Sequence, residues 1–166
     1  MRRLVVCLAF LVAVGGAVPA AAQDETGLRI RGIGPRVGVS ISPHQFVFGG
    51  HLDLGDILPF TTLRFPVLEM GLGDNLWMGS AAVDLYYRFQ DRWVGWTPIA
   101  GGEVAYYFGS LDLPDGANEN FSDLGLVGIL GLEREVGGNN RFGVELKLGF
   151  LDAPDFKFLA VWTFGD

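Results

Sequence analysis

Apolar and polar side chains alternate along several stretches of this chain, and the alternation limits the fold more than any other sequence feature. In residues 141–150 the even positions are Phe142, Val144, Leu146, Leu148 and Phe150, and the odd ones are Arg141, Gly143, Glu145, Lys147 and Gly149. Successive side chains of a β-strand point to opposite faces, so one face of this segment is apolar and the other carries charge or glycine. The chain is therefore predicted to consist of strands whose two faces meet different surroundings.

The first 22 residues have the features of a secretory signal. Two arginines follow Met1, residues 4–18 are mostly apolar, and small alanines (Ala20 to Ala22) precede Gln23. We predict a cleaved signal peptide over 1–22, an N-terminal tail over 23–34 and one folded domain over 35–166. The one cysteine, Cys7, leaves with the signal, so the mature chain has no thiol for a disulfide or for catalysis.

The charge of the mature chain argues against a nucleic-acid partner. Removing Arg2 and Arg3 with the signal leaves ten cationic residues against nineteen acidic ones, a formal charge of −9. Nucleic-acid binding needs a basic patch, and this sequence has none.

Glycine and proline divide the mature chain into eight alternating segments. Strands are predicted at about 35–42, 45–54, 66–73, 79–89, 97–108, 124–133, 141–150 and 156–164. An even number of antiparallel strands joined in order can close into a barrel that leaves no edge unpaired. The predicted fold is an all-β, eight-stranded antiparallel up-and-down transmembrane β-barrel.

The apolar phase of these strands is predicted to face lipid. An eight-stranded barrel is only just wide enough for side chains to fill, and the many aromatics and leucines of this phase would overfill it. The aromatics also gather near strand ends, as in the two interfacial girdles of membrane barrels. The alternative is a soluble periplasmic barrel with the apolar phase inward around a small apolar ligand. On the lipid-facing reading, Leu146→Lys should impair assembly and Glu145→Gln should be mild.

The opposite phase holds the charged residues, which are predicted to form an ion-paired network inside the barrel. Its members are Arg36, Asp53, Glu69, Asp84, Arg88, Glu103, Glu133, Arg141, Glu145, Lys147 and Lys157. Buried charges need partners, so a filled barrel would carry such a set for structural reasons alone. A lumen that conducts water or small solutes is the functional alternative, although an eight-stranded barrel is narrow.

No catalytic or cofactor signature emerges from the remaining residues. Glu69 and Glu103 could form a carboxylate pair only if the fold brought them together. His44, His51 and the hydroxyls of Ser40 and Ser42 offer no recognisable base with an orienting acid, so a lipid-modifying enzyme is the weaker alternative. The acidic segment 109–123 lacks the ligand spacing of a calcium loop. We predict no enzyme activity, no cofactor and no metal.

Several stretches resemble bacterial outer-membrane β-barrel domain proteins, the small barrels of the OmpA and OmpX type. The resemblance is carried by residues 34–55, 63–74, 84–89 and 96–102, and it covers nearly the whole mature chain. It implies an outer-membrane location with outer-membrane lipid as the surroundings, and a structural or surface-interaction role. If both termini are periplasmic, the loops at 43–44, 74–78, 109–123 and 151–155 face outside.

The C-terminus resembles the signal that the outer-membrane assembly machinery reads. Lys157, Trp162 and Phe164 match its polar residue and its two spaced terminal aromatics. Leu159 stands where glycine is usual, and Gly165 and Asp166 follow the last aromatic. The assembly machinery is accordingly a predicted partner during insertion.

Overall fold

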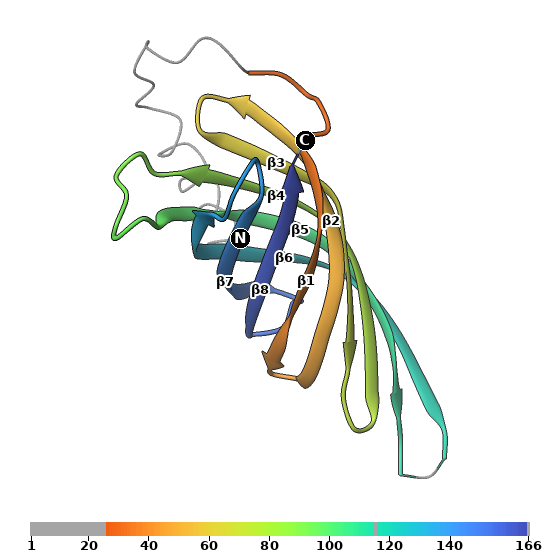
Figure 1. Cartoon of the computed structure of the whole chain (residues 1–166). Helices are drawn as coiled ribbons and strands as arrows, with labels where there is room; N and C mark the ends of the chain where they lie inside the picture. The colour runs from red at the N-terminus through yellow and green to blue at the C-terminus, as the bar shows by residue number, and fades with distance from the viewer. Residues whose placement is uncertain (1–25, 115, 166) are drawn as a thin grey trace.

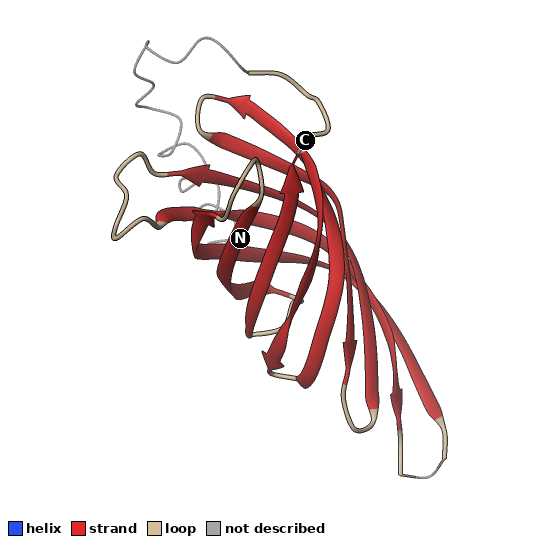
Figure 2. Ribbon diagram, in the orientation of Figure 1, coloured by secondary structure: helices blue, strands red, loops and turns tan. Residues whose placement is uncertain are grey.

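The computed structural model describes residues 26–114 and 116–165, which form eight strands (Figures 1 and 2). The strands are β1 (Gly32–Ile41), β2 (His44–Leu58), β3 (Thr61–Leu72), β4 (Leu76–Arg88), β5 (Thr97–Asp112), β6 (Asn118–Glu135), β7 (Arg141–Leu151) and β8 (Phe156–Gly165). The described residues include no helix long and apolar enough to cross a membrane. The predicted signal peptide, 1–22, lies outside the described residues.

The strands pair in chain order and close on themselves. Each strand is antiparallel to the next, and β1 pairs with β8, so the sheet is a closed barrel. This confirms the predicted fold class. Gly32 and Gly165 are partners in that last pairing, so β1 begins and β8 ends at the same end of the barrel. We call this end the terminal end. The turns that follow β1, β3, β5 and β7 lie at the other end, which we call the projecting end (Figure 1).

At the terminal end the strands are longer than the sequence predicted. Strand β1 begins at Gly32 rather than at residue 35, so the last three residues of the predicted tail belong to the barrel. The rest of the described tail lies along β2, because the amides of Gly27, Arg29 and Arg31 bond to its carbonyl oxygens at 2.8–3.0 Å. The β2–β3 hairpin also extends through residues 55–65, which the sequence left between two strands.

At the projecting end, the predicted 109–123 loop is wrong. Strand β5 continues to Asp112 and β6 starts at Asn118, so residues 113–117 alone connect them. The two strands stay paired throughout, with Ser110 opposite Asn120 and Asp112 opposite Asn118. Polar residues occupy both faces here, so the alternation that identified strands elsewhere is absent. The result is a long β5–β6 hairpin that reaches beyond the β1–β2 and β7–β8 turns (Figure 1).

The apolar phase of the strands lies on the outside of the barrel, as predicted. Val39 is 48% exposed, Phe46 54% and Val104 48%, and their neighbours one position along, such as Ser40, Gln45 and Glu103, are buried. Aromatic rings contact one another on this surface near both ends of the barrel. Trp77, Phe108 and Tyr106 interact near the projecting end, and Phe142, Trp162 and Phe164 near the terminal end.

Backbones approach closely at the β1–β8 seam, where β1 supplies glycine. A Cβ on Gly38 would lie 1.8 Å from the carbonyl oxygen of Phe158. On β5, by contrast, a Cβ on Gly102 would find its nearest neighbour, the carbonyl oxygen of Val127, at 3.5 Å, an ordinary contact.

We expect Gly38→Ala to weaken the barrel, because the added methyl group must push two backbones apart. Overpacking of this kind costs about 1–3 kcal/mol, and here the obstructing atoms are backbone. Gly102→Ala should leave stability within about 0.5 kcal/mol of the parent. Urea unfolding of both variants in the same lipid vesicles measures the difference, and equal stabilities would contradict the close approach at the seam.

Candidate functional site: the charged lumen

The centre of the lumen is organised around the Glu69 carboxylate on β3. Its two oxygens accept hydrogen bonds from Arg36 at 2.8 Å, Lys147 at 3.1 Å and Lys157 at 2.8 Å. These cations come from β1, β7 and β8, so one carboxylate links four strands. All four side chains are at most 3% exposed. One acidic side chain therefore satisfies three buried cations.

Arg36 contacts three carboxylates from three different strands. In addition to Glu69, its guanidinium donates to Asp84 on β4 at 3.2 Å and lies 3.8 Å from Glu145 on β7. Lys147 completes this group by contacting Glu103 on β5 and lying 3.8 Å from Asp84. Side chains of six strands thus meet across the middle of the barrel.

A second group of charges fills the terminal half of the lumen. Arg64 on β3 contacts Glu145 and lies 3.5 Å from Glu133 on β6. Arg141 binds Glu133 at 3.2 Å and also contacts Asp53 on β2. Because Glu145 touches both Arg36 and Arg64, it joins this group to the central one.

The structure brings all eleven charged residues predicted for the lumen into ion pairs with inward partners. The inward pairs also include three residues that the prediction omitted: Arg31, Asp56 and Arg64. Seven cations (Arg31, Arg36, Arg64, Arg88, Arg141, Lys147, Lys157) then face seven acids (Asp53, Asp56, Glu69, Asp84, Glu103, Glu133, Glu145). Equal numbers of opposite charges allow each group to have a partner without water.

Arg64 was missed because it precedes the predicted strand 66–73, and a β-bulge after it also reverses the phase of β3. Counting back by twos from Glu69 points Phe65 inward and Arg64 outward. The β3–β4 register instead shifts between Arg64 and Val67, so both of those point inward and Phe65 is 50% exposed. The sequence does contain a signal for this, since Pro66 is typical of a bulge and an arginine cannot readily face lipid.

Asp56 was missed because it lies in the unpredicted extension of the β2–β3 hairpin, and Arg31 because it lies in the tail that precedes β1. Asp56 accepts from Arg31 at 3.1 Å, from Arg88 at 2.5 Å and from the hydroxyl of Thr62 at 2.6 Å. These groups close the network at the terminal end.

Two aromatic rings are buried among the charges. Tyr86 lies under the Arg64 guanidinium, whose carbon is 4.3 Å from the ring centroid, and Tyr107 has the Lys157 ammonium 5.0 Å from its centroid. The Tyr107 hydroxyl donates to Glu103 at 3.3 Å. Cation–π contacts strengthen when water is excluded, so these rings add to the pairing as well as filling space.

The geometry predicts that Glu145→Gln destabilises the barrel, in place of the mild effect expected from the sequence. The Glu145 side chain is 1% exposed and lies between two arginines. An amide in its place would leave both guanidinium groups with one negative partner fewer in a buried setting, where losing one member of a pair is strongly destabilising.

The candidate catalytic groups are placed as follows. Glu69 and Glu103 do come together, but both bind Lys147 within the network and are buried. The His51 ring is 2.9 Å from the hydroxyl of Thr163. The Ser40 hydroxyl donates to the carbonyl of Phe156 at 3.4 Å, and His44 is exposed at the β1–β2 turn. Among the described residues, no group of three acidic, histidine or cysteine side chains is arranged to hold a metal.

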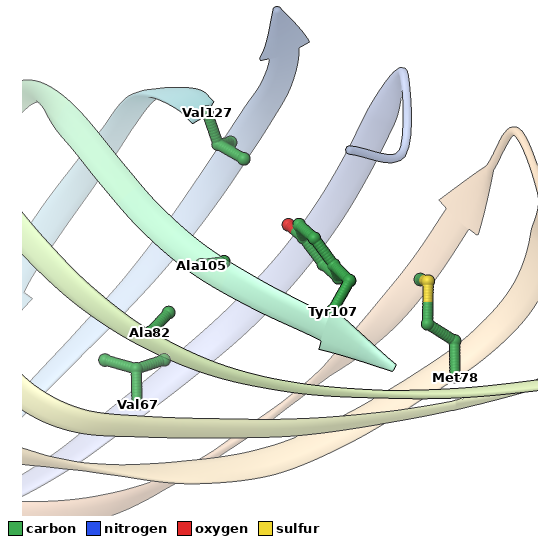
Figure 3. Close-up of a cluster of buried hydrophobic side chains, with 6 residues drawn as sticks. All are labelled: Val67, Met78, Ala82, Ala105, Tyr107 and Val127. Carbon is green, nitrogen blue, oxygen red and sulfur yellow. The ribbon is translucent and has the colours of Figure 1, made fainter. Parts of the chain in front are cut away.

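An apolar cluster lies beside the charges toward the projecting end. It consists of Val67, Met78, Ala82, Ala105, Tyr107 and Val127, with Phe121 and Ala153 packed against it (Figure 3). Strands β3 to β6 contribute all six core members. Ion pairs thus fill the middle and the terminal half of the lumen. Apolar side chains from β3 to β6 fill one side of the lumen nearer the projecting end.

These features define a small closed barrel with an apolar exterior and a charge-filled interior. Similar barrels occur among solved structures of outer-membrane proteins. Neisserial surface protein A superposes with a TM-score of 0.60 and 11% identity, covering 81% of this chain and 95% of that one. The N-terminal β-barrel domain of Pseudomonas aeruginosa OprF gives 0.64 and 14%, covering 82% and 98%. No protein-family model and no curated protein sequence matches the chain.

These likenesses establish the fold. The predicted resemblance to small eight-stranded barrels of the OmpA and OmpX type is confirmed at that level.

Proposed function

We propose that this protein spans a bacterial outer membrane as a closed, non-conducting barrel and presents the β5–β6 hairpin at the cell surface. Its role is structural or surface-interacting and does not involve catalysis. The apolar exterior, with aromatic rings near both ends, suits a bilayer. Backbone groups inside a bilayer must be satisfied within the protein, as they are in a closed barrel. The soluble alternative needs an apolar interior, and this barrel has its apolar phase outside.

The observation that carries the non-conducting role is the position of Arg36. Its side chain is fully buried and joins β1 to carboxylates on β3, β4 and β7. Ions or solutes passing along the lumen would have to separate these pairs. Such separation exposes unpaired charges in a poorly hydrated space, which is costly. The same pairing occupies Glu69 and Glu103, the two carboxylates considered for hydrolysis.

Planar-bilayer recording tests this role. The purified barrel should insert without producing steady channel currents. A boiled and an unboiled sample on a detergent gel should differ in mobility, which verifies that the inserted protein is folded. Steady, reproducible conductance from heat-modifiable protein would contradict a closed lumen and favour the conducting alternative.

Insertion is proposed to depend on the assembly machinery through the C-terminal strand. Trp162 and Phe164 are on the exposed face of β8, whereas Lys157 is buried against Glu69 in the finished barrel. The machinery would therefore have to read Lys157 before the barrel closes. Cells producing Trp162→Ala with Phe164→Ala should accumulate unfolded, protease-sensitive protein in the periplasm, and normal outer-membrane yield would contradict the proposal.

A further inference from the structure

The projecting end of the barrel contains a cavity that the proposed function does not use. Its volume is about 370 Å³, within the range of pockets that hold small organic molecules. Its walls come from the inner side of the long β5–β6 hairpin, from β4, and from the β1–β2 and β7–β8 turns. The hairpin extends past these turns, so the cavity opens on the side that the proposed topology exposes to the exterior.

The floor of the cavity is apolar. Met78 and Tyr107, which are 8% and 1% exposed, belong to the buried cluster of Figure 3, and Phe121 and Ala153 pack against it. Below Tyr107 the Glu103 and Lys157 side chains are committed to the central ion pairs. A ligand would therefore contact aromatic and thioether surface without reaching the charged lumen.

Two carboxylates line the same cavity. Asp123 projects from β6 and Asp152 from the β7–β8 turn; both are exposed, and neither forms an ion pair within the described part of the chain. No described arginine or lysine lines the cavity. The surrounding surface is also acidic, with Asp74, Asp112, Glu119 and Asp155 on exposed segments of the projecting end. A field of one sign raises the local concentration of oppositely charged ligands.

We propose that this cavity binds an organic cation with an aromatic or short alkyl body. The ammonium group would pair with Asp123 and Asp152, and the body would lie on Met78, Tyr107 and Phe121. The Phe121 ring can add cation–π attraction, because its face is negative. The inference goes beyond the proposed function, but it relies on the projecting end being accessible in the folded barrel.

Methionine methyl NMR on the barrel in lipid nanodiscs tests this proposal. Met78 lines the cavity, and Met70 lies on the outward phase of β3, so the second methyl group reports partition of the probe into lipid. The probe is 1-naphthylmethylammonium, with 1-naphthalenemethanol as its neutral match. We expect the cation to shift the Met78 resonance saturably and to bind about tenfold more tightly than the alcohol, because a hydrogen bond between charged groups is roughly twice as strong as a neutral one.

Two double variants distinguish binding to the cavity carboxylates from a general electrostatic effect of the acidic projecting end. Asp123→Asn with Asp152→Asn should lower the affinity for the cation to that of the alcohol. Asp112→Asn with Glu119→Gln removes the same charge from residues that do not line the cavity, and should leave the affinity within about twofold. Asparagine also suits the positive φ of Asp152, 40°, so the substitution should not distort the turn.

Three results would overturn the proposal. These are a Met78 resonance that does not respond to the cation, equal affinities for the cation and the alcohol, and equal losses in the two double variants. A failure of the proposed function is detected by other measurements. Steady conductance, or loss of the boiling-dependent mobility shift, would be seen in the absence of the naphthyl probe. The gel shift on each variant verifies that altered binding does not come from misfolding.

Discussion

Replacing Glu69 with glutamine will destabilise the barrel by about 3–5 kcal/mol, the effect of removing one member of a buried ion-pair group. Glu69 binds Arg36, Lys147 and Lys157, and its side chain is 2% exposed. The amide keeps the size of the side chain but removes the charge that balances three cations. Urea unfolding in lipid vesicles, followed by tryptophan fluorescence, measures the loss.

The control for this prediction is the same substitution at an exposed ion pair. Glu135 binds Arg92 at 3.2 Å, but the two side chains are 65% and 59% exposed. Water screens such a pair, so Glu135→Gln should change stability by less than about 1 kcal/mol. Removing a cation as well, in Glu69→Gln with Lys157→Met, should recover part of the loss. Equal effects of Glu69→Gln and Glu135→Gln would show that the central charges do not stabilise the barrel.

Introducing a lysine at Leu146 will impair insertion, at a cost of about 2–4 kcal/mol for a cation on the lipid face at mid-membrane. Leu146 is in the middle of β7 on the outward phase, with Leu130 and Phe158 as its strand partners. Its lysine would be surrounded by apolar side chains and lipid. The fraction of protein that becomes heat-modifiable in vesicles, together with its urea stability, measures the effect.

Val94→Lys serves as the matched control for that prediction. Val94 is 83% exposed in the connection between β4 and β5 at the terminal end, where a cation can stay hydrated. We expect insertion to match the parent and stability to be no lower, because lysine suits the positive φ of this position, 51°, better than the β-branched valine does. If the two lysines were equally tolerated, the outer surface around β7 would not face lipid.

The existence, order and facing of the strands could be predicted from the sequence because they depend on local alternation. In residues 141–150 of β7, for example, apolar residues alternate with charged residues or glycine, and the buried positions 143, 145 and 147 lie on the predicted inward face. Alternation fails where both faces meet water, as at Ser110 and Asn120 in the β5–β6 hairpin. It also fails at the bulge after Arg64, where one extra residue reverses the phase.

Which charged residues face the lumen could also be predicted mostly from the local sequence, because a charged side chain in such a strand can face the lumen but not the lipid. Which charged residues pair with one another could not be predicted from the local sequence. Arg36 and Asp84 are 48 residues apart, and Lys157 and Glu69 are 88 apart, yet each pair is in hydrogen-bonding contact. The register between strands decides such contacts, and the bulge and the closing β1–β8 seam contribute to that register.

The sequence by itself determined that the chain forms eight strands with an apolar face and a charged face, because side-chain alternation and the energy of burying charge act residue by residue. Only the tertiary structure decided that Glu69 serves three cations, that Glu145 links two arginines, and that Asp123 and Asp152 face one cavity. These arrangements depend on strand register and closure, which place residues from distant parts of the chain within a few ångströms.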